Sequence, residues 1–232
     1  MPVLDQDRQR AVLGLVVLNS GDYAREGGYG RPSDAALRFV HDVPRWLGVR
    51  SLVFQHMPLP QYYDVLKAMP ANADNAIQGY RKYDAQYYVL DDDRTLPGGY
   101  LGEGVSCPDE DCGEFAALRD TDGYIGVVVG HDHRNGFVGS LNGMMLVATP
   151  TCGFGSYGPA AANRAARLFE FDIRHLYSPR TQLLTFGELV GKPSSNKAYT
   201  YAVEGQSNAA DGVNLLRKPG LLAGVAAALK KI

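Results

Sequence analysis

The segment Tyr124–Asn135, YIGVVVGHDHRN, decides the fold, because an apolar run ends there in a polar turn that contains two histidines. The run Tyr124–Val129 has no charged side chain, which is typical of a strand buried inside a sheet. Two earlier segments repeat the pattern. Ala11–Leu18 (AVLGLVVL) leads into a polar turn, and Ser51–Phe54 (SLVF) leads into Gln-His-Met-Pro. The sequence therefore predicts buried strands, each followed by a polar loop.

Helical patterns lie between these runs. Ser33 can cap a helix over the apolar residues that follow it, and Pro44 is expected to kink or end that helix. Cys112–Arg119 has apolar residues at helical spacing. Further strands are predicted at Met144–Ala148 and Arg167–Phe171, and a glycine-rich loop over 98–104. This alternation predicts an α/β fold.

The character of the sequence changes after Asp172. Thr181–Val190 fits one more strand or a short helix, Gly191–Asp211 is polar, and Leu215–Lys231 fits an Ala/Leu-rich helix with basic residues in its last turn. We therefore expect a main domain over residues 1–172, and a C-terminal extension over residues 173–232 that packs on it as a helical appendage.

Composition excludes several classes of function. The chain has 232 residues, of which 45% are hydrophobic, and its net charge is −2. No general attraction to nucleic acid or to anionic lipid is expected from so balanced a charge. Three cysteines do not form the dense, even framework of a secreted disulfide domain, which favours a cytoplasmic protein. The sequence contains no pattern of a signal peptide or a membrane anchor.

Three histidines follow two of the predicted strands. His56 comes after the second strand, and His131 and His133 come after the run at Tyr124. Loops beyond the carboxyl ends of strands gather functional groups in α/β sheets, so the two strands are expected to be neighbours and the histidines to converge. Neutral imidazole is a good ligand for Zn, Mn, Fe or Ni. A histidine in such a loop is also often a hydrogen-bonded structural residue.

Several blocks of sequence occur together in the order seen in one known family. They are Gly130–Asn135 (GHDHRN) with Phe137 after it, Phe54–Tyr62 (FQHMPLPQY), Gly104–Cys107 (GVSC) and Gly153–Gly158 (GFGSYG). Over residues 11–172 the chain resembles the C-terminal half of calcineurin-like metallophosphoesterases. Within that family, the Gly-His-Asp-His-x-Asn motif resembles the subgroup of purple-acid-phosphatase-like enzymes. The implied fold is part of an αββα sandwich.

The resemblance implies a two-metal site that hydrolyses phosphate mono- or diesters, in which paired ions bind the phosphate and activate water. It assigns His56 and His131 to one divalent ion (Mn, Fe, Zn or Ni) and His133 to the other. It places Asn135 and Asp132 beside the ligands. Asp132 fits a solvated turn residue equally well, and we favour that interpretation. A further segment, the loop containing Gly155 and Tyr157, is expected beside the substrate.

The N-terminal motifs of the same family are missing. The sequence contains no Asp-x-His and no Asn-His, and its single Gly-Asp pair is Gly21-Asp22. Without a bridging carboxylate, we expect one weakly held ion or none, and little or no phosphoesterase activity. A truncated sandwich is also expected to expose apolar surface near residues 11–18. The chain should therefore form a homo-oligomer or bind a complementing N-terminal half.

Two other functions are compatible with the sequence. The first is a non-catalytic binding or assembly module derived from the same fold. The second is a dinucleotide-binding oxidoreductase, because Gly153–Gly158 fits G-x-G-x-x-G and an acid, Asp172, lies further on. The second is the weaker alternative, since Pro159 follows the motif directly and a strand rather than a helix is predicted after it.

Overall fold

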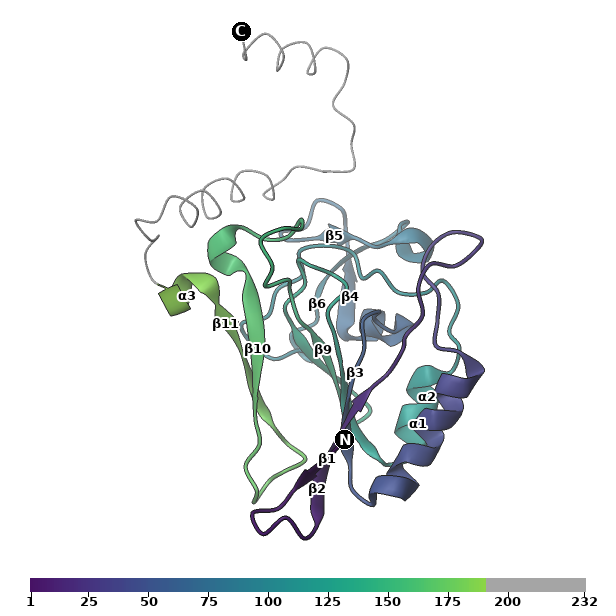
Figure 1. Cartoon of the computed structure of the whole chain (residues 1–232). Helices are drawn as coiled ribbons and strands as arrows, with labels where there is room; N and C mark the ends of the chain where they lie inside the picture. The colour runs from purple at the N-terminus through teal and green to yellow at the C-terminus, as the bar shows by residue number, and fades with distance from the viewer. Residues whose placement is uncertain (191–232) are drawn as a thin grey trace, which may run out of the picture.

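A six-stranded mixed sheet forms the centre of the computed structural model, which describes residues 1–190 (Figure 1). In spatial order its strands are β1 (Pro2–Leu4), β2 (Ala11–Val17), β3 (Ser51–Phe54), β7 (Tyr124–Val129), β9 (Met144–Ala148) and β8 (Val138–Leu141). Strands β2, β3, β7 and β9 run parallel, and β1 and β8 pair antiparallel at the two edges. The α/β class is confirmed, and β3 and β7 are neighbours as predicted.

Strand β1 changes one expectation about the edge of this sheet. It pairs antiparallel with β2, with Val3 opposite Leu13, so the run near residues 11–18 is not an open edge. Strand β1 was not predicted, because a strand of three residues carries almost no periodic signal. Apolar side chains are still exposed at this edge, among them Val3, Leu4 and Val17, and oligomerisation through this region stays a prediction.

Helices cover one face of the sheet: α1 (Asp34–Leu47) and α2 (Glu114–Asp120) lie on the right in Figure 1. The Ser33 hydroxyl caps α1 as predicted, accepting a hydrogen bond from the Ala36 amide at 3.2 Å. Pro44 does not end the helix, which continues for three residues to Leu47. Proline has no N–H to donate to the carbonyl of Val40. The Tyr124 hydroxyl of β7 donates to that carbonyl instead, at 2.5 Å.

The core on this face is extensive. It joins buried side chains of four parallel strands to both helices and to the 3-10 segment η1 (Pro60–Val65). Tyr62 of η1 is buried and donates a hydrogen bond to the Val127 carbonyl at 2.9 Å, which ties η1 to β7. This face of the sheet is therefore closed by elements from three separate parts of the chain.

A β-hairpin covers the other face. It consists of β10 (Ala165–Glu170) and β11 (Arg180–Thr185), and it lies on the left in Figure 1 between η3 (Ala161–Asn163) and α3 (Phe186–Val190). Phe169 and Phe171 pack here against a smaller cluster that includes Leu52 and Val147. The segment 181–190, expected to be a strand or a short helix, contains both. The expected boundary at residue 172 falls in the turn of this hairpin.

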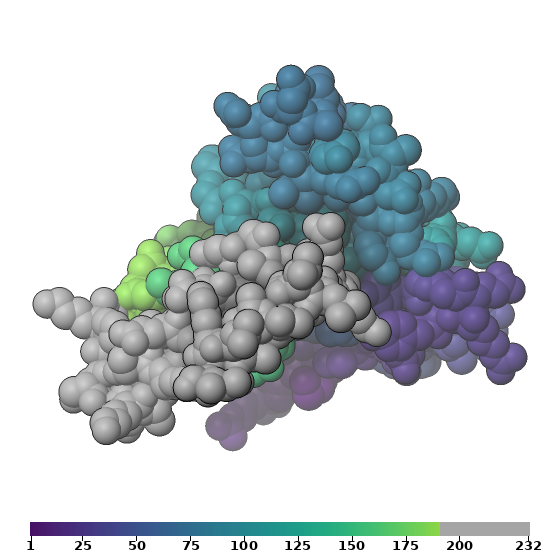
Figure 2. Space-filling view, turned by 90° about the horizontal axis from the view of Figure 1, so that it is seen from above, coloured from purple at the N-terminus to yellow at the C-terminus, as the bar shows by residue number. Residues whose placement is uncertain are grey.

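A second, three-stranded sheet was not predicted. It has the order β4 (Leu66–Met69), β6 (Tyr87–Leu90) and β5 (Ile77–Gln78), all antiparallel, with η2 (Arg81–Tyr83) between β5 and β6. Figure 2 shows the surface of this part of the chain, in blue, as a lobe beside the N-terminal region. Gly98–Gly104 then returns toward the main sheet as a loop, as predicted.

The polar segment Gly191–Asp211 and the predicted helix Leu215–Lys231 lie outside the described residues. No helix within residues 1–190 has the length and apolar character that a membrane crossing requires.

Candidate functional site

Two histidines meet where β3 and β7 end. Because these strands pair in parallel, with Phe54 opposite Val128, the residues that follow them emerge at the same edge of the sheet. The His131 amide donates to the His56 carbonyl at 3.1 Å, which extends this pairing by a few residues. The two rings then lie 4.9 Å apart between centroids, with His131 Nδ1 3.0 Å from His56 Nε2. The structure brings these two predicted site residues together, and their role as ligands stays a prediction.

The ring of His131 is held neutral. Burial lowers its pKa to about 4, and the neighbouring His56 and His133 add to the effect. A neutral imidazole can bind a metal ion. Two nitrogens that bind the same tetrahedral zinc ion lie about 3.3 Å apart. The observed 3.0 Å between Nδ1 and Nε2 is a hydrogen-bond distance, so one ring donates to the other here, and it lies within about 0.3 Å of the spacing expected for two ligands of one ion.

His133 is turned toward a different partner. Its ring stacks on Tyr157 at 4.3 Å between centroids, and its Nδ1 lies 2.7 Å from the Tyr157 carbonyl oxygen. A carbonyl can only accept, so Nδ1 carries the proton and the lone pair is on Nε2. Such a backbone contact fixes the orientation of many metal-binding histidines, and it fixes structural histidines equally well.

Asp132 is a buried residue, and the interpretation of it as a solvated turn residue is wrong. It is only 5% exposed, and its carboxylate accepts hydrogen bonds from the Ser106 amide and the Asn135 side chain. Burial raises the pKa of Asp132 to about 7, and the charge of Glu103 raises it further. The correction has a simple cause: the Gly104–Cys107 loop packs over Asp132, and this contact across 26 residues has no local sequence signal.

Asn135 holds the same two loops together from the other side. It is fully buried, and its Oδ1 accepts hydrogen bonds from the amides of Gly102 and Glu103 at 3.0 and 3.1 Å. The approach is so close that a Cβ on Gly102 would lie 2.5 Å from the Arg134 carbonyl oxygen. Asp132 and Asn135 thus shape the loop that carries the histidines, and both of their side chains are engaged in doing so.

Two residues near the histidines were missed by sequence analysis. The Glu103 carboxylate accepts from the Arg134 amide at 2.8 Å and from the Tyr157 hydroxyl at 3.3 Å, and burial raises its pKa. The ring of Tyr29 lies edge-on to His131 at 4.3 Å and stacks on Tyr80. Glycines around Tyr29 indicate only a turn, so nothing in the sequence marks it as a neighbour of His131.

The loop Gly153–Gly158 is organised by a buried arginine. Arg164 is 2% exposed, and its guanidinium donates to the carbonyls of Gly153 and Ser156. This places Tyr157 beside His133, whereas Gly155 is exposed and has no neighbouring atom where a side chain would lie. The loop continues into η3 and strand β10. The helix that a dinucleotide-binding fingerprint requires is absent there, which removes the structural support for that alternative.

The donor set does not fit a dinuclear metal centre. Among residues 1–190, no group of three or more His, Cys, Asp or Glu side chains is arranged to hold a metal ion. Asp132 and Glu103 are the acids nearest to the histidines in the sequence and in the surrounding loops. The carboxyl groups of both accept hydrogen bonds from these loops. The His56–His131 pair alone offers two ligands for one ion.

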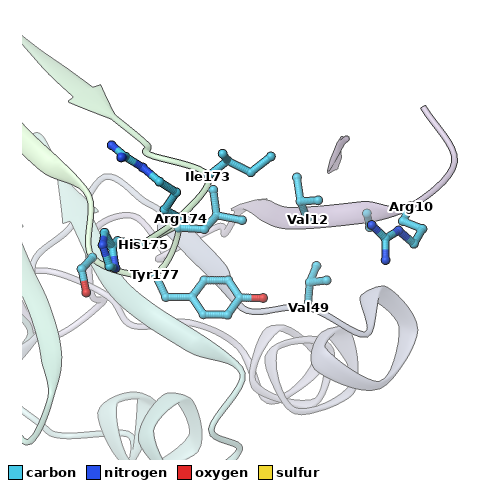
Figure 3. Close-up of a pocket in the computed structure, with 10 residues that line it drawn as sticks. Arg10, Val12, Val49, Ile173, Arg174, His175 and Tyr177 are labelled. Atoms are coloured by element: carbon cyan, nitrogen blue, oxygen red, sulfur yellow. The ribbon is translucent and has the colours of Figure 1, made fainter. Parts of the chain in front are cut away.

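A hollow of about 520 Å³ lies elsewhere, where β2 begins (Figure 3). Its walls include Arg10, Val12, Val49 and the hairpin turn with Arg174 and Tyr177. It shares no residue with the histidine pair, which lies where the parallel strands end. Its two arginines are already paired with aspartates: Arg10 with Asp5 and Arg174 with Asp172. This hollow is therefore not an extension of the histidine site.

Comparison with known proteins gives a distant phosphatase-like relative. The chain is 26% identical over 182 residues to the Arabidopsis thaliana protein named "Probable inactive purple acid phosphatase 29". The match covers 72% of this chain and 40% of that protein, so the chain spans about two fifths of the length of this relative. No family model matches the chain, and no solved structure matches it. The similarity and the mixed α/β sheet agree with part of a metallophosphoesterase-type sandwich.

Proposed function

We propose that this chain is a metallophosphoesterase-type module that binds one divalent ion weakly through His56 and His131. We further propose that it has little or no phosphoesterase turnover by itself. The observation that carries the proposal is the donor set: two imidazole nitrogens lie 3.0 Å apart, and the described residues add no third metal-binding side chain beside them. The distant relative is itself named as an inactive phosphatase.

The chemistry explains why two imidazoles are not enough. Hydrolysis by two metals needs a second ion near the first, so that attacking and leaving oxygens are both stabilised. Neutral imidazoles supply no negative charge to offset two divalent cations. The acids Asp132 and Glu103 already accept hydrogen bonds that hold the loops around the histidines. Neither forms a group of three metal-binding side chains with the histidines among the described residues.

A partner could complete the site where the chain itself does not. His131 is neutral, and the tautomer of His133 leaves a lone pair on Nε2, so both are ready to act as ligands. Carboxylates from a complementing N-terminal half or from a second copy of the chain would then create the centre. The substrate in that case is a small phosphate ester. Without such a partner, the module serves binding or assembly.

Metal analysis and hydrolysis assays on the purified chain test the proposal. With Mn²⁺, Zn²⁺ or Ni²⁺ supplied, we expect at most one bound ion per chain and hydrolysis of aryl phosphate mono- and diesters no faster than with the metal alone. His131→Ala and His56→Ala should each abolish the bound ion. His41→Ala, which removes an exposed histidine of α1, should not.

Two results would contradict the proposal in different ways. Turnover that depends on His131 and scales with bound metal would make the chain an active phosphoesterase while keeping the location of the site. Metal binding or turnover that is unaffected by both substitutions would remove the site as well.

A further inference from the structure

A small hairpin stands beside the histidine pair, in the segment between β2 and α1. Tyr23 and Tyr29 pair antiparallel across it, and the Ala24 amide donates to the Gly28 carbonyl at 3.1 Å. The tight turn forms because Gly27 and Gly28 adopt φ angles of 91° and 82°, which residues with a side chain rarely adopt. The two tyrosines are thereby fixed as cross-strand partners.

The rings of both tyrosines lie on one face of this hairpin, because residues paired directly across two strands project their side chains to the same side. The ring centroids are 5.7 Å apart. Tyr29 is the inner ring, since it lies edge-on to His131 at 4.3 Å between centroids. Tyr23 is the outer ring and is 77% exposed. The hairpin therefore turns an aromatic face, the tyrosine platform of Tyr23 and Tyr29, toward the histidine pair.

The short helix η2 and the residue before it hold the hairpin in place. The Arg81 guanidinium donates three hydrogen bonds to Asp109, at 2.8 to 3.2 Å. It also lies against the turn of the hairpin, where a Cβ on Gly28 would be 2.7 Å from Arg81 Nε. The ring of Tyr80 stacks on Tyr29 at 5.6 Å between centroids. A platform that is fixed before a ligand arrives loses little conformational entropy on binding.

The chemistry of the platform decides which part of a phosphate ester it suits. Its two rings are uncharged, so they offer no attraction to the phosphate group. A flat tyrosine ring instead attracts another flat ring, because stacked rings bury apolar area and favour offset contact. The rings of Tyr80, Tyr29 and Tyr23 already form a row, and Tyr23 is its exposed end. A planar ring of a ligand would continue this row.

We propose that the tyrosine platform binds the organic group of the phosphate ester, and that this group is a planar aromatic ring. The inference rests on the proposed function, because the phosphate itself would be held by the ion at His56 and His131. An aryl ester carries its ring directly beside the phosphate, as the platform lies directly beside His131. An alkyl ester offers no flat face to Tyr23. Tyr23 is therefore a residue that determines specificity and takes no part in metal binding.

Binding of three phosphate monoesters to the full chain tests the inference. Phenyl, cyclohexyl and ethyl phosphate carry the same charged group and differ in the organic group, which is a flat ring, a puckered ring or a short chain. Ligand-observed NMR gives their dissociation constants, with Zn²⁺ supplied and with Zn²⁺ removed by a chelator. With Zn²⁺, phenyl phosphate should bind at least about fivefold more tightly than either of the others, because stacking of one ring contributes a factor of this size or more.

Substitutions locate the ring. Tyr23→Ala should reduce the preference for phenyl phosphate to less than about twofold, because the exposed stacking face is lost. Tyr23→Phe keeps the ring and should keep the preference. Tyr177→Ala is the matched control, since it removes a tyrosine that is 40% exposed in the turn between β10 and β11, and it should also keep the preference. The affinity for Zn²⁺ should be the same in all three variants.

Three results would overturn the platform: no measurable binding of phenyl phosphate, equal affinity for phenyl and cyclohexyl phosphate, or a preference that survives Tyr23→Ala. The platform and the proposed metal site can also fail separately. A preference that depends on Tyr23 but is unaffected by Zn²⁺ and by His131→Ala would support the platform and contradict the metal site. Zn²⁺ bound through His131 without a preference for phenyl phosphate would support the metal site and overturn the platform.

Discussion

The two faces of the central sheet are covered in different ways. On one face, α1, α2 and η1 close a large cluster that includes Val40, Tyr62 and Leu146. On the other, the hairpin β10–β11 covers a smaller cluster that includes Leu52 and Val147. Both covers add hydrogen bonds to the sheet, from Tyr62 on the first face and from Arg167 on the second. The first cover comes from three distant parts of the chain, whereas the second is one local hairpin. Stability should therefore be concentrated on the helix-covered face.

The largest expected effect compares two leucines on opposite faces. Leu146 and Leu52 are both 0% exposed, on the helix-covered and hairpin-covered faces respectively. Either Leu→Ala change should lower the free energy of unfolding by about 2–5 kcal/mol. The loss for Leu146→Ala should lie at the upper end of this range, because tightly packed side chains collapse less into the cavity that the substitution leaves. Urea denaturation gives both values. A greater loss for Leu52→Ala would break the comparison.

A smaller effect is expected within the hairpin. Phe169 packs on the cluster beneath β10, with its ring edge-on to Phe54 at 6.3 Å, while Leu168 faces outward and is 38% exposed. Phe169→Ala should lower the free energy of unfolding by about 2–4 kcal/mol, because the ring is only partly buried. It should also speed amide exchange in β10 and β11 while leaving β7 protected. Leu168→Ala is the control and should do neither. Equal loss of protection in β7 would mean that both faces unfold as one unit.

The smallest effect concerns a single hydroxyl on the helix-covered face. Tyr124→Phe removes the donor to the Val40 carbonyl and leaves that buried oxygen without a partner. The free energy of unfolding should fall by about 1–3 kcal/mol. Tyr23→Phe is a suitable control because Tyr23 is 77% exposed and should change stability little. An unchanged stability in Tyr124→Phe would show that the helix needs no support at its proline.

Long apolar runs made the centre of the fold predictable. The bounds of β3, β7 and β9 match their predicted ranges, because strands buried on both faces consist almost wholly of apolar residues. The small sheet was missed for the opposite reason. Its strands are short, β5 has only two residues, and none is fully apolar and buried. Such strands form through pairing with residues 9 to 24 positions away, and their own short sequences carry little sign of it.

Some features of the candidate site could likewise be predicted from the sequence, and others could not. The meeting of His56 and His131 follows from two strand ends, and both strands were visible in the sequence. The contacts of Tyr29 and Glu103 with the histidine loop were not, because they join segments about 30 to 100 residues apart. The burial of Asp132 belongs to the same class. Sequence analysis predicted that the two histidines meet, but not the hydrogen bonds that surround them.

The link between Tyr124 and α1 also bears on the order in which the protein folds. A helix with Pro44 in its interior is a poor structure on its own, since one of its carbonyls lacks a donor. The missing donor lies 84 residues later, in β7. More than half of the chain must therefore be synthesised before this one carbonyl of α1 can exchange water for a protein donor. We expect the end of α1 to become fully stable only when β7 packs against it, because closing so long a loop is slow.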